Sequence, residues 1–437
     1  MPTAIVAGGG LAGLAAAAAL GSAGYEVDLL ESRAFLGGRA TSYPLPGSES
    51  GEVIDNCQHI LLRCCVNLLD FYRRMRVETA VAFHREFFFL EPGGRRSLLK
   101  AGALPAPLHF AGSFLGFHAL SLADKIAIGR GLLAVRKEYR KRADLDQMTM
   151  GAWLREKKQT QRAIDRFWGP VLVSAINEDL DRMAAVHGLQ VFWLGFLASA
   201  NSYEMGIPSV PLSELYSADK WAGKANFHMR CSVEEFVVAD GAIASLRTNQ
   251  GSLFADAYVC ALPFERIHGL DLDVSRFTHS PITGIHLWFD RVITELPHAV
   301  LLDRTIQWMF NKSEGRYIQL VVSASRSLTE KPRGEVIDLA LRELAEFFPA
   351  VRKAKLEKAH VVKEVRATFS AAPGLEAERP GSETPLSNLF LAGDWTRSGW
   401  PATMEGAVRS GYLAAEAVTR HFGKPERFVL PDIASSS

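Results

Sequence analysis

Ala4-Ile-Val-Ala-Gly8-Gly-Gly10-Leu-Ala-Gly13 stands at the start of the chain and decides the fold. Its first four residues are apolar and predict a short, buried parallel strand. Gly8, Gly10 and Gly13 follow at the G-x-G-x-x-G spacing. This spacing allows a tight turn, a close approach of the backbone to a pyrophosphate, and close packing of the next helix. We therefore expect a dinucleotide-binding βαβ unit with phosphates at the helix N-terminus.

The next segments supply further parts of such a site. Glu26-Val-Asp-Leu-Leu-Glu31 predicts a second strand, and Glu31 at its end is placed to bind ribose hydroxyls and to disfavour a 2′-phosphate. Gly37-Gly38-Arg39 follows and suggests a second backbone approach with a guanidinium clamp. The alternative for this tripeptide is an ordinary surface turn with a solvated arginine.

A matching segment lies almost four hundred residues later. Leu389 to Ala392 predicts a strand, and Gly393-Asp394 ends it, where open α/β sheets bind ligands. A helix from about Ala402 to His421 would point its positive N-terminal end, near Thr403-Met404, at a flavin ring. Asp394 would accept hydrogen bonds from a ribityl chain. A site made from both ends of the chain favours FAD over NAD.

Composition limits the remaining possibilities. The 437 residues are enough for two domains, and the net charge of +1 does not favour nucleic acid as a partner. The five cysteines form no metal-ligand pattern, so we expect no metal, and their scatter suits a reducing cytosol. The N-terminus leads directly into a strand, without a secretory signal. We expect a cytoplasmic protein.

One apolar stretch, Leu104 to Leu122, is almost free of charge and is followed by seven basic residues between Lys125 and Arg142. Such a pattern is found where a protein lies in a membrane interface, which would place the protein on the inner face of the cytoplasmic membrane. The alternative is a buried loop and helix with a solvated basic end. No stretch reaches the length of a transmembrane helix.

The order of strand and helix signals predicts an α/β, two-domain flavoprotein that is discontinuous in sequence. Strand signals around Asp240-Gly241 predict a hairpin. We assign residues 1–64, 206–262 and 383–424 to a Rossmann-like FAD-binding domain with a β-meander. A mixed α+β substrate domain takes 65–205 and 263–382, and 425–437 form a tail whose end we expect to be frayed.

With both ends placed, the chain resembles the flavin-containing amine oxidase and carotenoid desaturase superfamily over nearly its full length. The resemblance implies that Val233 pairs its backbone with adenine, and that Gly393, Asp394, Ala402, Thr403 and Met404 hold the ribityl chain and the ring. The residues implied to bind the ADP and pyrophosphate part are Gly8, Gly10, Leu11, Ala12, Gly13, Glu31, Ser32, Gly38, Arg39 and Ala40.

Within that superfamily the chain is similar to the hydroxysqualene dehydroxylases. Three segments carry this likeness: Asp55 to His59, Phe167 to Pro170 with Asn177, and Gly399 to Gly406. It implies reductive dehydroxylation of hydroxysqualene to squalene by hydride from reduced FAD, in squalene and hopanoid biosynthesis. Cys57 departs from the family pattern, which has glycine there, and its side chain would crowd the flavin face.

Two other functions stay open. The same FAD could desaturate a carotene-like isoprenoid, or the chain could be a flavin-bound partner of a membrane or an isoprenoid synthase without catalysis. The sequence names no electron donor.

Dehydroxylation needs a proton donor and a pocket that tolerates a cation. The stretch from Asp55 to Leu62, where a third strand could meet the cofactor ring, is called the flavin segment below. His59 in that segment and Glu178 after the aromatic Phe167-Trp168 segment are the candidate acids, and the alternative for each is a structural role. The faces of Trp168 and Trp400 are candidate pocket walls that could stabilise positive charge.

Overall fold

The core of the nucleotide-binding part is a five-stranded parallel sheet of order β10-β2-β1-β14-β20. The structure is a computed structural model that describes residues 1–47, 51–217, 221, 225–267 and 269–433. The sheet takes its strands from three separate stretches of the chain, which gives the expected α/β class. Its strands are β1 (Thr3–Ala7), β2 (Glu26–Glu31), β10 (Asn226–Met229), β14 (Ala257–Cys260) and β20 (Leu389–Leu391).

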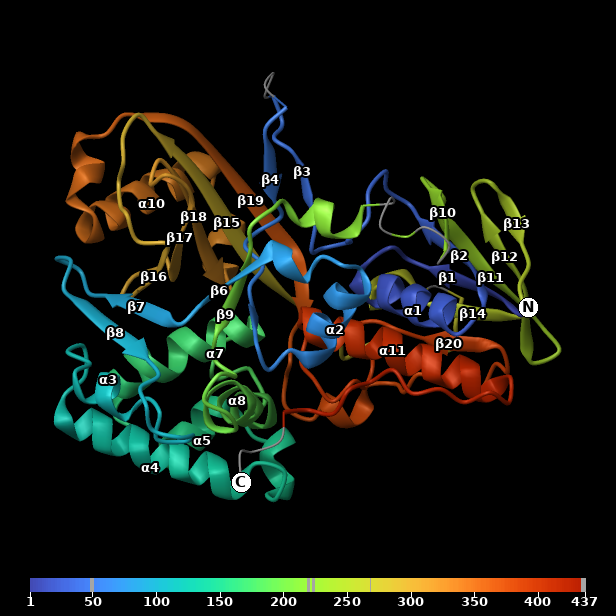
Figure 1. Ribbon diagram of the computed structural model, residues 1–437, viewed down its shortest axis with the longest axis horizontal. Coiled ribbons are helices and arrows are strands. Elements are labelled where there is room, and N and C mark those ends of the chain that lie inside the picture. Colours follow the sequence, from blue (N-terminus) through green and yellow to red (C-terminus); the bar gives the residue numbers. More distant parts are fainter. Residues whose placement is uncertain (48–50, 218–220, 222–224, 268, 434–437) are drawn as a thin grey trace.

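Two helices pack together against this sheet, α1 (Leu11–Ser22) and α11 (Met404–His421), and Figure 1 shows them side by side. Small residues make this approach possible. A Cβ added to Gly411 would stand only 2.2 Å from the carbonyl oxygen of Ala12 and 2.9 Å from the amide nitrogen of Ala16. The N-terminal and C-terminal parts of the site are therefore joined by direct helix contact.

A three-stranded meander adjoins this sheet. It consists of β11 (Val233–Ala239), β12 (Ala242–Thr248) and β13 (Gly251–Leu253). Asp240 and Gly241, between the first two strands, both have positive φ, 49° and 74°. That is the conformation of the tight turns that match the twist of a hairpin. The predicted hairpin is confirmed.

The second part of the protein is built on a seven-stranded sheet of order β19-β15-β18-β17-β16-β7-β8. Helix α10 (Arg333–Phe347) covers one face, where Val336 and Leu344 pack on Ile285 and Leu320. The strands of this sheet are β7 (Glu86–Leu90), β8 (Arg96–Lys100), β15 (His279–Phe289), β16 (His298–Leu301), β17 (Trp308–Ser313), β18 (Tyr317–Ser323) and β19 (Leu356–Phe369).

A group of helices meets the opposite face of the seven-stranded sheet, where the Nε1–H of Trp308 donates to the Oγ of Ser174 at 2.7 Å. Figure 1 shows these helices below the sheet and the parallel sheet with α1 and α11 to the right. The helices are α3 (Ala111–Leu115), α4 (Leu122–Glu138), α5 (Met150–Glu156), α6 (Gln161–Ala163), α7 (Gly169–Ile176) and α8 (Ala185–Phe192).

Further short elements complete the two parts. They are α2 (Val66–Arg74), α9 (Arg326–Thr329), β3 (Ser42–Pro44), β4 (Val53–Asp55), β5 (Leu61–Leu62), β6 (Val81–His84) and β9 (Met205–Pro208). In the described part of the chain, no helix combines the length and the apolar character that crossing a membrane requires.

The segment expected to be a tail packs on the protein as far as the structure follows it. Phe428 is buried, and the backbone N–H of Leu430 donates to the Oδ1 of Asn67 at 2.7 Å. Asp432 forms ion pairs with Arg140 and Arg409. Residues 434–437, the end that we expected to be frayed, lie outside the described residues.

The close contact of α1 with α11 predicts the effect of one methyl group. Gly411→Ala should lower the free energy of unfolding by about 1–3 kcal/mol, because backbone atoms of α1 must move to admit it. Gly129→Ala in α4 is the matched control: its added Cβ has no neighbour within 4 Å among the described atoms. It should be neutral or stabilise by about 0.5–1 kcal/mol. Urea denaturation measures both, and equal effects would contradict the packing argument.

Candidate active site

The phosphate cradle is closely packed on one side and open on the other. Gly8 has φ of 116°, and a Cβ there would stand 2.8 Å from the carbonyl oxygen of Ala261. A Cβ on Gly13 would overlap the carbonyl oxygen of Gly8 at 1.9 Å. By contrast, the nearest described atom to a Cβ on Gly10 would be the Cα of Gly38, at 3.9 Å. Only Gly10 therefore faces free space, where a pyrophosphate fits above the start of α1.

Glu31 is held rigidly beside that cradle. Its Oε2 accepts from the backbone N–H of Gly9 at 2.9 Å, and its Oε1 accepts from the N–H of Arg33 at 2.8 Å and the hydroxyl of Ser32 at 3.1 Å. The carbonyl oxygen of Glu31 accepts from the N–H of Cys231 at 2.9 Å, which brings the half-buried Val233 close by. The residues predicted for ribose and adenine thus lie together.

Arg39 and Asp394 join the two halves of the cofactor site. Arg39 Nη2 lies 2.7 Å from the Oδ1 of Asp394, which is 355 residues away in sequence, and its Nη1 donates to the carbonyl oxygen of Ala367 at 2.9 Å. We predicted a pyrophosphate clamp for Arg39 and a ribityl acceptor for Asp394. The structure brings these two residues into direct contact, and the chain itself engages both Nη atoms of Arg39. The clamp role of Arg39 therefore stays a prediction.

The N-terminus of α11 has the predicted position after the Gly393-Asp394 turn. The Oγ1 of Thr403 accepts from the N–H of Gly406 at 3.0 Å and starts the helix. Glu405 is buried, and its carboxylate accepts from the N–H of Leu68 at 2.7 Å and from the Nδ2 of Asn67 at 2.8 Å. The Glu405 charge therefore caps α2, and the half-buried Thr403 and Met404 remain at the helix end with Ala402.

Arg379 organises the loop between β20 and α11, and sequence reasoning missed it. This guanidinium is fully buried and donates to the carbonyl oxygens of Asp394 at 2.9 Å and Trp400 at 2.7 Å, and also to those of Trp395 and Thr396. Glu376 balances its charge. The sequence carries no signal for this role, because the acceptors are backbone atoms brought together only by the fold.

Cys57, the departure from the family pattern, is accommodated by a glycine on the seven-stranded sheet. This sheet belongs to the predicted substrate domain and is called the substrate sheet below. Cys57 has φ of 62° and is buried. A Cβ on Gly284 of β15 would stand 3.4 Å from the Cys57 Sγ, so the thiol lies directly against this strand. Burial raises the pKa of the Cys57 thiol to about 12, because the thiolate is desolvated and Glu364 is nearby. Cys57 is thus a neutral thiol packed against β15 of the seven-stranded sheet.

The two predicted acids differ in their surroundings. Glu178 is fully buried, and both of its carboxylate oxygens lie 2.7 Å from guanidinium nitrogens of Arg326, with Ser370 as a further donor. This ion pair supports the structural alternative for Glu178, and a role for this carboxylate as an acid stays an untested prediction. His59 is half-buried, and its Nδ1 has no hydrogen-bond partner among the described residues. Burial lowers the His59 pKa, so this ring is neutral at pH 7.

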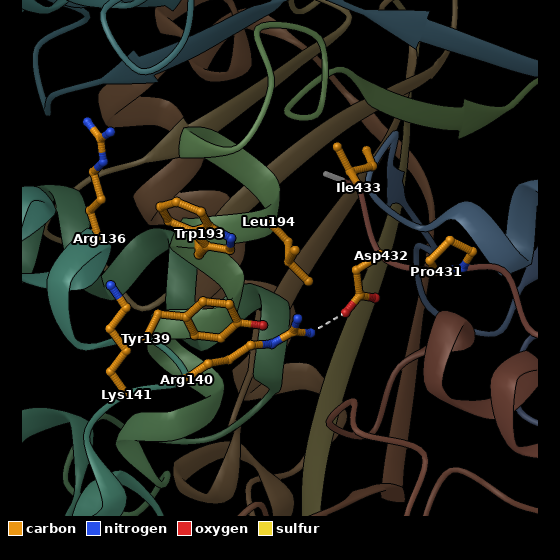
Figure 2. A pocket seen from close by; sticks show the side chains of 9 residues that line it. All are labelled: Arg136, Tyr139, Arg140, Lys141, Trp193, Leu194, Pro431, Asp432 and Ile433. Carbon is orange, nitrogen blue, oxygen red and sulfur yellow. Dashed lines mark hydrogen bonds and ion pairs between the residues drawn. The ribbon is translucent and has the colours of Figure 1, made fainter. Parts of the chain in front are cut away.

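Both predicted tryptophans have their indole N–H groups satisfied. Trp168 is fully buried, donates to the Oε1 of Gln159 at 2.8 Å, and contacts the ring of Phe192 at 4.4 Å between centroids. Trp400 donates to the Oδ1 of Asp432 at 3.1 Å. Asp432 also lines a surface pocket of about 410 Å³, where Figure 2 shows it pointing at Arg140. A role for either tryptophan in the substrate pocket stays a prediction.

Polar side chains of the substrate sheet reach the flavin segment, and the sequence reasoning did not name them. The Nζ of Lys312 on β17 lies 2.9 Å from the Oδ2 of Asp55 and 3.1 Å from the Oε1 of Gln58. The period of two in β17 and β18 is the signal that could have found them, since it places Lys312 and Gln319 on the face opposite the mainly apolar one under α10.

The sequence profile of a family described as flavin containing amine oxidoreductase matches residues 11–419. The chain belongs to this family. It is 25% identical over 453 residues to 15-cis-phytoene desaturase of Synechococcus elongatus, covering 94% of this chain and 95% of that protein. Zeta-carotene desaturase of Arabidopsis thaliana is 26% identical, over 94% of this chain and 84% of its own length.

Among solved structures, an oxidoreductase from Methanosarcina mazei superposes with a TM-score of 0.72 at 18% identity, covering 96% of this chain and all of that one. The fold is therefore that of FAD-dependent amine oxidase-type proteins, as expected, and FAD is the cofactor of this flavin-dependent oxidoreductase. Within the described residues, no group of three or more His, Cys, Asp or Glu side chains is arranged to hold a metal ion.

The position of Glu31 predicts its contribution to cofactor binding. Glu31→Ala should weaken FAD binding about 10- to 100-fold, since it removes the carboxylate that we expect to bind the ribose hydroxyls and that accepts from Gly9 of the cradle. The matched control is Glu26→Ala, an exposed acid at the other end of the same strand, which should retain FAD fully. Flavin absorbance after gel filtration measures the retained cofactor. Equal retention in the two variants would contradict the assignment of Glu31.

Proposed function

We propose that this protein is an FAD-dependent oxidoreductase of a linear polyisoprenoid lipid. The observation that carries the proposal is a wall of aromatic side chains on the side of the substrate sheet that faces the helices. Trp308 and Phe310 of the sheet and Phe192 and Phe196 from α8 and the turn after it belong to one buried cluster. A long apolar substrate gains free energy by leaving water for such surroundings.

The charges beside this wall do not favour an amine substrate. A cationic amine needs a free carboxylate or an aromatic cage to bind it. Asp55 is paired with Lys312, and Asp394 is paired with Arg39. Each acid is therefore already neutralised by a cation of the chain itself.

The cofactor supplies two-electron hydride chemistry when bound, and the chain supplies the dry surroundings and the orientation of the lipid. The comparisons favour desaturation, because the relatives above are named phytoene and zeta-carotene desaturases. In that reaction one hydride and one proton leave adjacent carbons of the isoprenoid, and a new double bond forms. A carotene-like substrate is accordingly the first candidate.

Reductive dehydroxylation of hydroxysqualene is the second candidate. Two segments with the hydroxysqualene dehydroxylase pattern support it: Asp55 of the first pairs with Lys312 of the substrate sheet, and the Trp400 carbonyl oxygen of the second accepts from the buried Arg379. In this reaction hydride enters the allylic carbon, the protonated hydroxyl leaves as water, and the cofactor is oxidised. This reaction would place the protein in squalene and hopanoid biosynthesis.

One pair of incubations separates these reactions. Protein with chemically reduced FAD and hydroxysqualene, under anaerobic conditions, should form squalene as the flavin is reoxidised if the second candidate holds. Protein with oxidised FAD and phytoene should form more unsaturated carotenes if the first holds. Chromatography of the lipids and flavin absorbance give both readouts. Absence of turnover with either lipid would overturn the proposal and leave a non-catalytic flavin-bound partner of a membrane or synthase.

We also propose that the predicted apolar segment touches the inner face of the cytoplasmic membrane. Large apolar side chains are exposed on this segment, and basic side chains lie on α4, which follows it. This combination favours binding to an anionic lipid surface. The exposed apolar side chains of the segment are Leu104, Leu108, Leu115 and Leu122, α4 continues them with Ile126 and Leu133, and the accompanying cations on α4 are Lys125, Arg130, Arg136 and Lys137.

If this contact exists, aspartate substitutions in the segment and at a similarly exposed position elsewhere should affect liposome binding differently. Leu115→Asp with Leu122→Asp, each side chain 70% exposed, should reduce flotation with anionic liposomes several-fold, because apolar area is lost and charge is added. Phe254→Asp, at a 72% exposed position between β13 and β14, is the control and should float as the unaltered protein does. Circular dichroism checks folding, and unchanged flotation of the double variant would refute the contact.

A further inference from the structure

A row of polar side chains crosses the substrate sheet on the face opposite α10. His286 on β15 pairs with Gln319 on β18 in the strand register. Gln319 pairs in turn with Phe310 on β17, and Phe310 pairs with His298 on β16. Directly paired residues of antiparallel strands point to the same face of a sheet. The three polar residues therefore lie on one line, with one aromatic ring among them.

These three side chains are fully buried, yet several of their polar atoms have no hydrogen-bond partner in the described part of the molecule. Both the Oε1 and the Nε2 of Gln319 are unpartnered, as are the Nε2 of His286 and the Nδ1 of His298. The other ring nitrogens are used: His286 Nδ1 lies 2.7 Å from the Tyr317 hydroxyl, and His298 Nε2 lies 2.8 Å from the Glu86 carbonyl oxygen. Burying an amide without partners is costly, so a ligand that satisfies it binds with a gain.

The row begins beside the flavin segment and extends into the aromatic wall. Gly284, two residues before His286 and on the same face, is in contact with Cys57. Phe310, within the row, and Trp308 beside it belong to the aromatic cluster that faces the helices. A lipid lying on this wall would thus meet the row where it approaches the cofactor.

The chemistry of the row fits a neutral oxygen group. Burial lowers the pKa of His286 to about 3 and that of His298 to about 4, so both rings are uncharged at pH 7. The Gln319 amide offers a donor and an acceptor at once. A hydroxyl group has one donor and two acceptor sites and can satisfy both atoms, whereas a hydrocarbon can satisfy neither.

We propose that Gln319, flanked by His286 and His298, binds a hydroxyl group of the isoprenoid and selects an alcohol over a hydrocarbon of the same skeleton. This inference rests on the proposed function, in that the substrate is an isoprenoid lipid. It assigns Gln319 a role in specificity that is independent of the direction in which the cofactor moves electrons.

Binding measurements test the role of Gln319 without turnover. The FAD-loaded protein is titrated with hydroxysqualene and with squalene in the same detergent, and perturbation of flavin absorbance gives the two dissociation constants. The unaltered protein should bind the alcohol about tenfold more tightly, the size of one or two satisfied hydrogen bonds. Gln319→Leu should remove this preference while still binding squalene.

Gln307→Leu is the matched control, because this glutamine is next to the same strands but has its amide satisfied. Its Nε2 donates to the carbonyl oxygen of Ser323 at 3.1 Å, and its Oε1 accepts from the N–H of Ser323 at 2.8 Å. Gln307→Leu should keep the preference for the alcohol and lower the Tm. Gln319→Leu should raise the Tm of the lipid-free protein, since an unpartnered amide is replaced by an apolar group.

The binding results distinguish failure of the role of Gln319 from failure of the proposed function. Equal affinity of the unaltered protein for alcohol and hydrocarbon, or an unchanged preference in Gln319→Leu, would overturn the role of Gln319 and leave the proposed function intact. The first of these needs no variant, so it holds even if Gln319→Leu fails to fold. Binding of neither lipid would instead overturn the proposed function, and the inference with it.

Discussion

The parallel pairing of β1, β14 and β20 is the constraint on which the site depends. It sets Ala7, Cys260 and Leu391 side by side, so that Gly8, Ala261 and the Gly393-Asp394 turn follow at the same carboxyl edge of the sheet. Ligands of open α/β sheets bind at this edge. Because the three strands come from the start, middle and end of the chain, the cofactor site exists only when the whole chain has folded.

Polar contacts then fix the geometry that this pairing makes possible. The loop after β20 has little regular structure, and its carbonyl groups would lack partners without the buried guanidinium of Arg379. The Arg39–Asp394 pair joins the first and last segments, and the Lys312–Asp55 pair ties the substrate sheet to the flavin segment. Partly exposed ion pairs of this kind add little net stability, so their contribution here is to hold together segments that are far apart in sequence.

The parts of the site that the sequence predicted are those set by local geometry. These parts are the glycine spacing, the acid at the end of β2 and the Asp240-Gly241 turn. Each depends on residues close together in the chain, so its pattern can be recognised in the sequence. The sequence could not decide between an acid and a structural role for Glu178, because its partner Arg326 is 148 residues away. Arg379 and the row through Gln319 escaped prediction for the same reason: register across four strands decides what surrounds Gln319, and no window of sequence contains it.

That row is also where the two candidate reactions make opposite demands on the chain. A carotene is a hydrocarbon, and a site built only for hydrocarbons would leave the Gln319 amide unsatisfied, at a cost of about 1–3 kcal/mol that leucine at this position would avoid. The hydroxyl of an alcohol substrate would satisfy the same amide and so be recognised by it, whereas the aromatic wall would contact either lipid. The physical chemistry of the row therefore favours an oxygenated isoprenoid, whereas the named relatives favour a polyene. One buried side chain, Gln319, would thus distinguish an alcohol from a hydrocarbon before any electron is transferred.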